Sequence, residues 1–365
     1  MTRLRRVSAT MPGLGRRRRG RGFEYLDLDG RRITDPAVVE RIRDLVIPPA
    51  WRDVWICADP RGHLQAVGTD ARGRRQYLYH PAWREHRDQR KHARVLLVAR
   101  RLPAARREVE ADLAERGLSR ERALACAFRL LDLGFFRVGG EEYAEENGSF
   151  GLATLLRRHV RVRRDHRLSF DYLAKSGQVR RIVLADEEAH RVVATMARYR
   201  SPEEQLFGYR VRGRWHDITS SDINDYVHGR LGDATAKDFR TWHATVLASA
   251  VLAHHWLEAD GQGRTPMSRT ARDRAVRATM KEVSGHLGNT PSVARASYVD
   301  PRVIDLFGEG RTIERAVRRL GHASRPALTR SATSGGAQGD GVEIASGIDR
   351  HEHAVLERAV LRLLG

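Results

Sequence analysis

The chain has 365 residues, 41% of them hydrophobic, and 66 Lys and Arg against 46 Asp and Glu give a formal net charge of +20. No apolar run reaches membrane-spanning length, so a membrane protein is not expected, and two cysteines are too few for a disulfide framework or a zinc site. The positive charge indicates a polyanionic partner, most simply nucleic acid, whereas a solubility adaptation usually favours acidic residues.

Almost all of the basic residues are arginines. Lysine occurs only at positions 91, 175, 237 and 281. A guanidinium group stays protonated, whereas an ammonium group can be tuned to give up its proton. A lysine kept in so arginine-rich a chain is therefore a candidate proton donor, although chance survival of a few lysines is the simpler explanation.

Residues 1–20 are basic and contain no acidic residue. This composition resembles that of an organellar transit peptide, but a disordered cationic arm is the simpler prediction. Residues 21–85 have the pattern of a small β-rich domain. Asp29-Gly30 predicts a hairpin turn, residues 36–45 predict a helix, and three short strands are expected at 54–58, 63–68 and 74–80.

The last of these strands separates two sets of side chains by the period of two. One face carries Arg75, Tyr77 and Tyr79, and the other carries Arg74, Gln76 and His80. A face of arginine and tyrosine is a plausible nucleic-acid surface. An exposed sheet face stabilised by cross-strand pairs explains the pattern about as well.

Residues 86–321 predict a larger and mostly helical domain. Helices are expected at 88–101, 103–115 and 119–133, and Arg137 follows in a turn, where it could simply pair with a nearby glutamate. Leu168 to Ala185 predicts a β-hairpin with Lys175 beside its Ser176-Gly177 turn. An exposed lysine in such a turn usually has no further role.

Further helix starts follow the hairpin. Helices are predicted at 186–199, from Ser201, and from Ser220 or Ser221 to about Gly232. Thr235 then caps a long helix with Asp238 at the capping-box position. Its first turns carry Lys237 and Arg240, which can meet a phosphate or can be merely solvated charge.

The stretch SGHLGNTPSVARASYVDP, residues 284–301, predicts a short helix with Thr290 as N-cap and Pro291 at the first helical position. Arg295 lies one helical turn before Tyr298, so both are expected on one side. Taken alone, the stretch is a surface helix with a half-buried tyrosine. Residues 322–348 have the composition of a disordered linker, and 349–365 predict a C-terminal helix whose HEHAVLE sequence lacks the HExxH zinc spacing.

Six segments together resemble the type IB DNA topoisomerases of the small bacterial and poxviral branch. They are IPPAW at 47–51, GRRQYLYH at 73–80, FFRVGGEEYAEENGSFGLATL at 135–155, LAKSG at 173–177, KDFRTWHA at 237–244 and LGNTPSVARASYVDP at 287–301. The resemblance covers residues 20 to 320 approximately. It implies an α+β protein in which a small β-rich domain and a larger helical catalytic domain with a β-hairpin clamp duplex DNA.

The resemblance also implies the catalytic residues. Tyr298 would attack a backbone phosphorus and form a 3′-phosphotyrosine, which preserves the bond energy for resealing without ATP. Arg137 and Arg240 would stabilise the charge on the five-coordinate phosphorus, and Lys175 would protonate the leaving 5′-oxygen. Asn289 stands where many members have histidine; an asparagine can donate a hydrogen bond but cannot exchange a proton at neutral pH.

No metal and no cofactor is expected, and the implied partner is duplex DNA bound by a monomer in the cytoplasm, associated with the nucleoid. The expected DNA contacts are Arg74, Arg75, Gln76, Tyr77, Tyr79, Lys237 and Arg295. Two alternatives stay open. A tyrosine recombinase or integrase shares the covalent step but would lack the segments at 47–51 and 73–80, and a non-catalytic DNA-binding protein would need only the charge.

Overall fold

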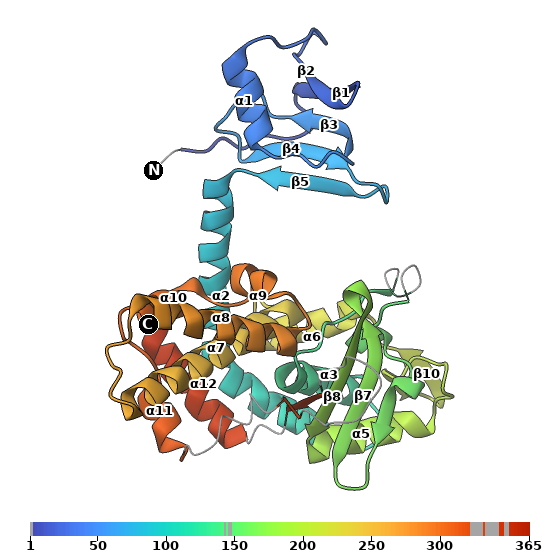
Figure 1. The fold of residues 1–365 in the computed structure, drawn as a ribbon. Coiled ribbons are helices and arrows are strands. Elements are labelled where there is room, and N and C mark those ends of the chain that lie inside the picture. The colour runs from blue at the N-terminus through green and yellow to red at the C-terminus, as the bar shows by residue number, and fades with distance from the viewer. Residues whose placement is uncertain (1–2, 142–143, 145–147, 322–330, 333–342, 347–349) are drawn as a thin grey trace. The chain divides into compact units, whose positions relative to one another are not determined.

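The computed structural model describes residues 3–141, 144, 148–321, 331–332, 343–346 and 350–365. It divides into two compact units, Met1–Lys91 and His92–Gly365. The first is built on an antiparallel sheet and the second is mostly helical (Figure 1), which confirms the α+β class expected from the sequence. The division lies close to the expected boundary after residue 85.

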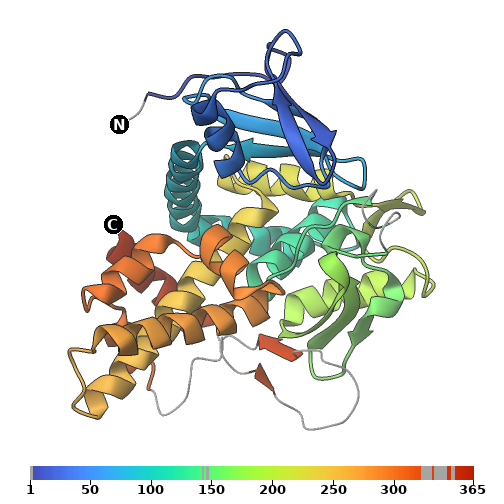
Figure 2. The same ribbon diagram turned by 45° about the horizontal axis from the view of Figure 1, so that its top comes forward.

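The first unit contains a five-stranded antiparallel sheet with the strand order β2-β1-β3-β4-β5. Helix α1, Pro36–Asp44, starts at its N-cap Asp35 and lies against one face of this sheet (Figure 2). Its Ile42 packs into a core with Leu14, Val54, Ile56 and Ala66. The strands are β1 Leu14–Arg19, β2 Gly22–Leu26, β3 Arg52–Ile56, β4 Leu64–Thr69 and β5 Arg75–Tyr79.

One expectation for this unit is wrong. Strand β1 lies within residues 1–20, which were expected to be a disordered arm; its Leu14 is buried while its arginines lie along the sheet. The expected hairpin turn at Asp29-Gly30 is confirmed, since Gly30 has φ +77° and Leu26 forms an antiparallel bridge with Arg32. On its other side β2 pairs with β1, because Gly20 supplies the left-handed turn between them at φ +55°.

Helix α2, Pro81–Ala114, runs across the boundary between the units. The sequence predicted a break between two helices at Leu102, but α2 continues through Pro103. Helix α3, Arg120–Gly134, then ends at Phe135, which takes up the left-handed conformation at φ 55°. This sharp exit turns the chain from the helix toward Arg137.

Helix α7, Ala236–Gly261, is the central helix of the second unit. Almost every residue from Ala236 to Ala253 is buried, because small and aliphatic side chains surround the helix on all sides. It contacts α8, α11 and α12, which lie beside it in Figure 1. The other helices are α5 Glu187–Arg198, α6 Ser220–Leu231, α8 Arg269–Leu287, α9 Pro291–Ser297, α10 Pro301–Gly308, α11 Glu314–Arg319 and α12 Arg350–Leu364.

The predicted hairpin is confirmed as strands β7, Arg167–Ala174, and β8, Gln178–Ala185, joined by the short 3₁₀ turn Lys175–Gly177. They belong to a sheet with the order β11-β12-β8-β7-β6. Its other strands are β6 Val160–Val162, β11 Ser331–Ala332 and β12 Glu343–Ser346, so parts of the segment expected to be a disordered linker are paired; the rest of 322–348 lies outside the described residues.

The helix expected from Ser201 is absent. Glu204 accepts hydrogen bonds from the Ser201 amide at 2.7 Å and hydroxyl at 2.8 Å, so the start signal is satisfied within a single turn. The chain then forms the two-stranded sheet of β9, Gly208–Val211, and β10, Arg214–Asp217. Among the described residues, no helix is long and apolar enough to cross a membrane. Both cysteines, Cys57 and Cys126, are unpaired and buried.

Candidate active site

Arg137 is held by the backbone on either side of it. Its carbonyl oxygen accepts from Leu152 at 2.8 Å, and Val138 accepts from Ala153 at 2.7 Å. The loop closes this tightly because Gly139 and Gly151 touch: a Cβ on Gly151 would lie 2.4 Å from the Gly139 Cα. The two glycines therefore allow the close backbone approach that holds Arg137 in place.

Arg240 is buried in the second turn of α7. The predicted start of that helix is confirmed, since Asp238 accepts from the Thr235 amide at 2.9 Å. The guanidinium of Arg240 donates to two backbone carbonyls, those of Phe135 and, at 2.7 Å, Leu287. These carbonyls belong to the ends of α3 and α8, so Arg240 joins three helices at one point.

Tyr298 ends α9, whose predicted start is also confirmed: Thr290 accepts from Val293, and Pro291 follows it. The carbonyl of Tyr298 accepts from the Thr245 hydroxyl of α7 at 3.3 Å, which fastens the tyrosine to the helix that carries Arg240. Its side chain is only 7% exposed, whereas Arg295 is exposed on α9. The two therefore do not form one group, because Tyr298 lies at the end of α9 with φ −129°.

The structure brings four of the five predicted catalytic residues together. Nη1 of Arg137 lies 3.5 Å from the Tyr298 hydroxyl, and Nη2 donates to Oδ1 of Asn289 at 2.6 Å. The guanidinium carbon of Arg240 lies 5.3 Å from the centre of the Tyr298 ring. Lys175, the fifth, lies at the exposed tip of the β7–β8 hairpin.

The electrostatics of this group favour an anion. Burial raises the pKa of the Tyr298 hydroxyl, but the charges and hydrogen bonds of Arg240 and Arg137 outweigh it and lower that pKa from 10 to about 8. Burial also lowers the pKa of Arg240 to about 9, and the neighbouring Arg137 adds to the shift. A negative group placed here would relieve both effects.

Two donors in the group have no hydrogen-bond partner among the described residues: Nε of Arg240 and Nδ2 of Asn289. Both are buried, and a buried donor without a partner is costly. Together with Arg137, they can supply hydrogen bonds to an oxyanion beside the Tyr298 hydroxyl. The arrangement is that of a nucleophile with preorganised donors for developing negative charge.

The predicted DNA contacts fall in both units. In the first, Tyr77 and Tyr79 stack with ring centres 6.3 Å apart, and Tyr77 is 48% exposed. Gln76 donates a hydrogen bond to Asp70 at 2.9 Å, and the side chain of Arg74 donates one at 2.8 Å. The amide and side-chain hydrogen bonds of Arg74 lower the pKa of Asp70 to about 2. Arg75 is exposed on the face of Tyr77, and Lys237 is exposed in the first turn of α7 in the second unit.

The sequence did not single out Arg180, a buried arginine beside the group. Its guanidinium donates to the carbonyls of Gly285 at 3.1 Å and His286 at 2.6 Å. A signal was present: strict alternation in β8 puts Arg180 on the same face as Ile182 and Leu184, and both of these are buried. An arginine on the inward face of a strand needs a specific partner.

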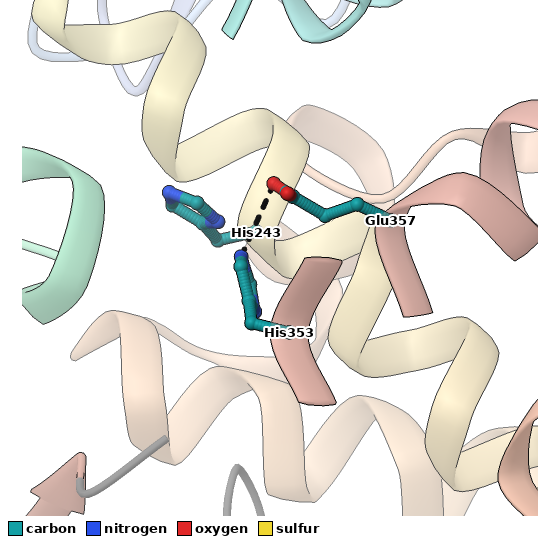
Figure 3. Close-up of side chains that lie close together, drawn as sticks. All are labelled: His243, His353 and Glu357. Carbon is teal, nitrogen blue, oxygen red and sulfur yellow. Dashed lines mark ion pairs between the residues drawn. The ribbon is translucent and has the colours of Figure 1, made fainter. Parts of the chain in front are cut away.

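A second polar cluster joins α12 to α7 and comprises His243, His353 and Glu357 (Figure 3). Its composition is that of a metal site, but Glu357 already accepts from Trp242 at 2.7 Å and from Arg106 at 2.6 Å. Arg106 also pairs with Asp132 at 2.8 Å. The carboxylates are thus occupied by buried hydrogen bonds, and the cluster forms an ion-pair network that anchors the C-terminal helix.

Comparison with known proteins gives two family matches. Residues 80–317 match the model of the eukaryotic DNA topoisomerase I catalytic core, and residues 22–70 match that of the bacterial DNA topoisomerase IB N-terminal domain. The DNA topoisomerase 1B of Acanthamoeba polyphaga mimivirus is 26% identical over 81% of this chain and 88% of its own. That of Vaccinia virus (strain Western Reserve) is 22% identical over 66% of this chain and 71% of its own.

Proposed function

The chain belongs to the type IB DNA topoisomerase family, since the catalytic-core model matches residues 80–317, and we propose that Tyr298 is the nucleophile with which it breaks and reseals one strand of duplex DNA. The enzyme is thus an isomerase that changes the topology of DNA. The match of residues 22–70 to the bacterial type IB N-terminal domain favours this assignment over a tyrosine recombinase. The comparisons also leave no support for a protein that only binds DNA.

The chemical step exchanges one phosphoester for another. The Tyr298 oxygen bonds to phosphorus as the bond from phosphorus to the 5′-oxygen breaks, which leaves a 3′-phosphotyrosine and a 5′-hydroxyl. The tyrosine proton is lost to solvent, which a pKa of about 8 makes accessible near neutral pH. Lys175 donates a proton to the leaving 5′-oxygen, a poor leaving group without one. Resealing reverses each transfer, so no ATP is consumed.

The observation that supports these roles is the convergence of donors on Tyr298. Arg137 reaches its hydroxyl, Arg240 lies by its ring, and Nε of Arg240 and Nδ2 of Asn289 lack partners among the described residues. A scissile phosphate beside the hydroxyl would accept from all of them. Loss of either arginine, Arg137 or Arg240, should raise the barrier by about 3–4 kcal/mol, as for oxyanion-hole donors.

The remaining roles concern binding. Arg74, Arg75, Gln76, Tyr77 and Tyr79 contact DNA from the first unit, and Lys237 and Arg295 contact it from the second. Exposure of Tyr77 and Arg75 supports the first set, and exposure of Lys237 and Arg295 supports the second. The protein acts as a monomer that clamps the duplex, and it associates with the nucleoid in the cytoplasm. Light scattering of the purified protein with and without a short duplex tests the monomer.

The decisive experiment is relaxation of negatively and positively supercoiled plasmid in the presence of a chelator and without ATP. The wild-type protein should relax both and form a covalent adduct with DNA. The Tyr298→Phe variant should bind DNA but do neither. Tyr199→Phe is a matched control, because Tyr199 is 49% exposed and distant in sequence from the group. Relaxation by Tyr298→Phe would show that another residue is the nucleophile.

A further inference from the structure

Arg180 connects the hairpin to the end of helix α8. It is 7% exposed, and its two terminal nitrogens donate hydrogen bonds to the carbonyl oxygens of Gly285 and His286 at 3.1 and 2.6 Å. Arg240 donates a hydrogen bond to the next carbonyl oxygen, that of Leu287, at 2.7 Å. Three consecutive carbonyls at the negative end of the α8 dipole are thus bonded by two arginines from different elements.

The side chains of β8 also lie directly against the turn that follows α8. Gly288 has φ +60°, and a Cβ there would lie 3.0 Å from Nη1 of Arg180 and 3.2 Å from Oε1 of Gln178. The next residue is Asn289, whose amide lies in the group around Tyr298. Arg180 therefore links the hairpin to the chain segment that carries Asn289 and Tyr298.

Tyr172 faces Arg180 from the neighbouring strand. The two are direct cross-strand partners, and the charge of Arg180 offsets part of the rise that burial causes in the pKa of Tyr172. The Tyr172 ring is buried and stacks on Phe136 with ring centres 6.3 Å apart. Lys175, at the hairpin tip, follows Tyr172 by three residues and precedes Arg180 by five. The pair of Tyr172 and Arg180 therefore lies just below the tip, one residue on each strand.

The hydrogen bonds that Arg180 gives to the end of α8 carry an electrostatic cost. No carboxylate forms an ion pair with Arg180 in the described part of the chain, and burial lowers the pKa of its guanidinium. The positive charge of Arg137 disfavours it further. An apolar side chain would avoid these costs, and a residue that breaks a packing rule beside a catalytic group is a candidate for function.

We propose that Arg180 is a positioning residue that holds the hairpin tip, so that Lys175 meets the leaving 5′-oxygen. The inference rests on the proposed role of Lys175 as the proton donor. The exposed tip is the movable side of the link, because the end of α8 is fixed by Arg240 as well as by Arg180. Loss of Arg180 therefore misplaces Lys175 and leaves Asn289 and Tyr298 in place.

The test compares single-turnover cleavage of ordinary DNA with cleavage of DNA that has a 5′-bridging sulfur at the scissile phosphate. A thiolate leaves without a proton, so this substrate does not need Lys175. Arg180→Met should slow cleavage of ordinary DNA by about 10²-fold, the effect of misplacing a catalytic group by about an ångström. On the sulfur substrate it should cleave at close to the wild-type rate.

Two variants serve as references. Arg181→Met removes the same charge from the next residue, which pairs with Asp171 at 3.3 Å on the other face of the hairpin, and it should leave both rates unchanged. Tyr172→Phe removes one hydroxyl from a buried ring and should show a smaller defect with the same rescue. It keeps the test valid if Arg180→Met does not fold.

The outcomes separate the two proposals. Rescue of Lys175→Ala and of Arg180→Met on the sulfur substrate supports both. Rescue of Lys175→Ala alone, with Arg180→Met or Tyr172→Phe equally slow on both substrates, overturns the role of Arg180. If Lys175→Ala itself is not rescued, Lys175 is not the proton donor, and the proposed chemistry fails before Arg180 is considered.

Discussion

Arg137 donates a hydrogen bond from Nη2 to Oδ1 of Asn289 over 2.6 Å. Because a guanidinium has only donors, the amide oxygen of Asn289 must face it, and the amide nitrogen must face the other way. That nitrogen has no partner among the described residues. The pairing therefore orients Asn289 as a donor before any substrate binds.

This orientation predicts an order of effects at position 289. Asn289→Ala should raise the cleavage barrier by about 1.5–3 kcal/mol, the contribution of a hydrogen bond to a charged group. Asn289→Asp should be slower still. Its carboxylate can still accept the hydrogen bond from Arg137, but it has no donor for the phosphate and repels the phosphate charge. Single-turnover cleavage rates measure the order. Faster cleavage by the aspartate than by the alanine variant would refute the assigned orientation.

The lowered pKa of Tyr298 predicts the pH dependence of cleavage. A pKa of about 8 means that the tyrosinate forms as pH rises through 8 instead of through 10. On the 5′-bridging sulfur substrate no leaving-group proton is needed, and at subsaturating DNA the pH dependence reports the pKa values of the free enzyme, so the rate should rise through this range. Arg137→Met removes one of the charges that lower the pKa, so its profile should shift to higher pH. An unshifted profile would assign the titration to another group.

The exposed face of β5 predicts salt-dependent binding. Arg75→Ala should remove one phosphate contact, so the slope of log affinity against log salt should fall by about one. Arg43→Ala is the matched control, since Arg43 is exposed on α1, which lies against the other face of the sheet. Fluorescence anisotropy with a labelled duplex at several salt concentrations measures both slopes. Equal slopes for the two variants would remove Arg75 from the DNA interface.

His286 predicts part of the acid sensitivity of the fold. Burial, and secondarily the charge of Arg180, lowers its pKa from 6.5 to about 4. As pH falls from 6.5 to 4, the unfolded chain binds a proton there and the folded chain does not, so stability is lost over this range, by about 3 kcal/mol in total. His286→Leu should reduce that loss in urea unfolding at each pH. The exposed His228→Gln should not, and a similar effect of both would contradict the assignment.

The buried ion pairs of Glu357 should contribute to the stability with which the C-terminal helix α12 is held. Burial raises the pKa of its carboxyl, but His353 and Arg106 outweigh this and hold it well below its usual range. Glu357→Gln leaves the buried Arg106 with one carboxylate fewer and should lower the free energy of unfolding by about 3–5 kcal/mol. Glu352→Gln, less buried on the same helix, should have little effect in the same urea titration. A loss below about 1 kcal/mol would mean that the network does not anchor α12.

Local signals predicted the elements that depend on local chemistry. The start of α9 at Thr290 and Pro291 and the capping of α7 by Asp238 are set by residues within four positions, and both are confirmed. The same kind of signal failed at Ser201, because Glu204 satisfies it without a following helix. It failed also at Pro103, where α2 continues through the proline.

The site depends on contacts that no local pattern encodes. Arg137 and Asn289 are 152 residues apart in the chain, so only the resemblance to a family joined them before the fold was known. The burial of Arg180 could have been predicted from the alternation in β8 alone, but its carbonyl partners lie more than 100 residues away in the chain. The charge of residues 1–20 led to a wrong prediction, since a strand can carry exposed arginines while one leucine reaches the core.

The two cysteines of the chain are both buried, Cys57 at 3% and Cys126 at 0% exposure, and burial raises the pKa of both thiols. Thiolate-directed reagents therefore find no native target in the folded protein. A cysteine introduced at Val179, which is 45% exposed beside the hairpin tip, would be the one site that a spin label or fluorophore modifies. No native cysteine therefore has to be removed before such a label is attached. The label would report motion of the hairpin as DNA is bound, cut and resealed.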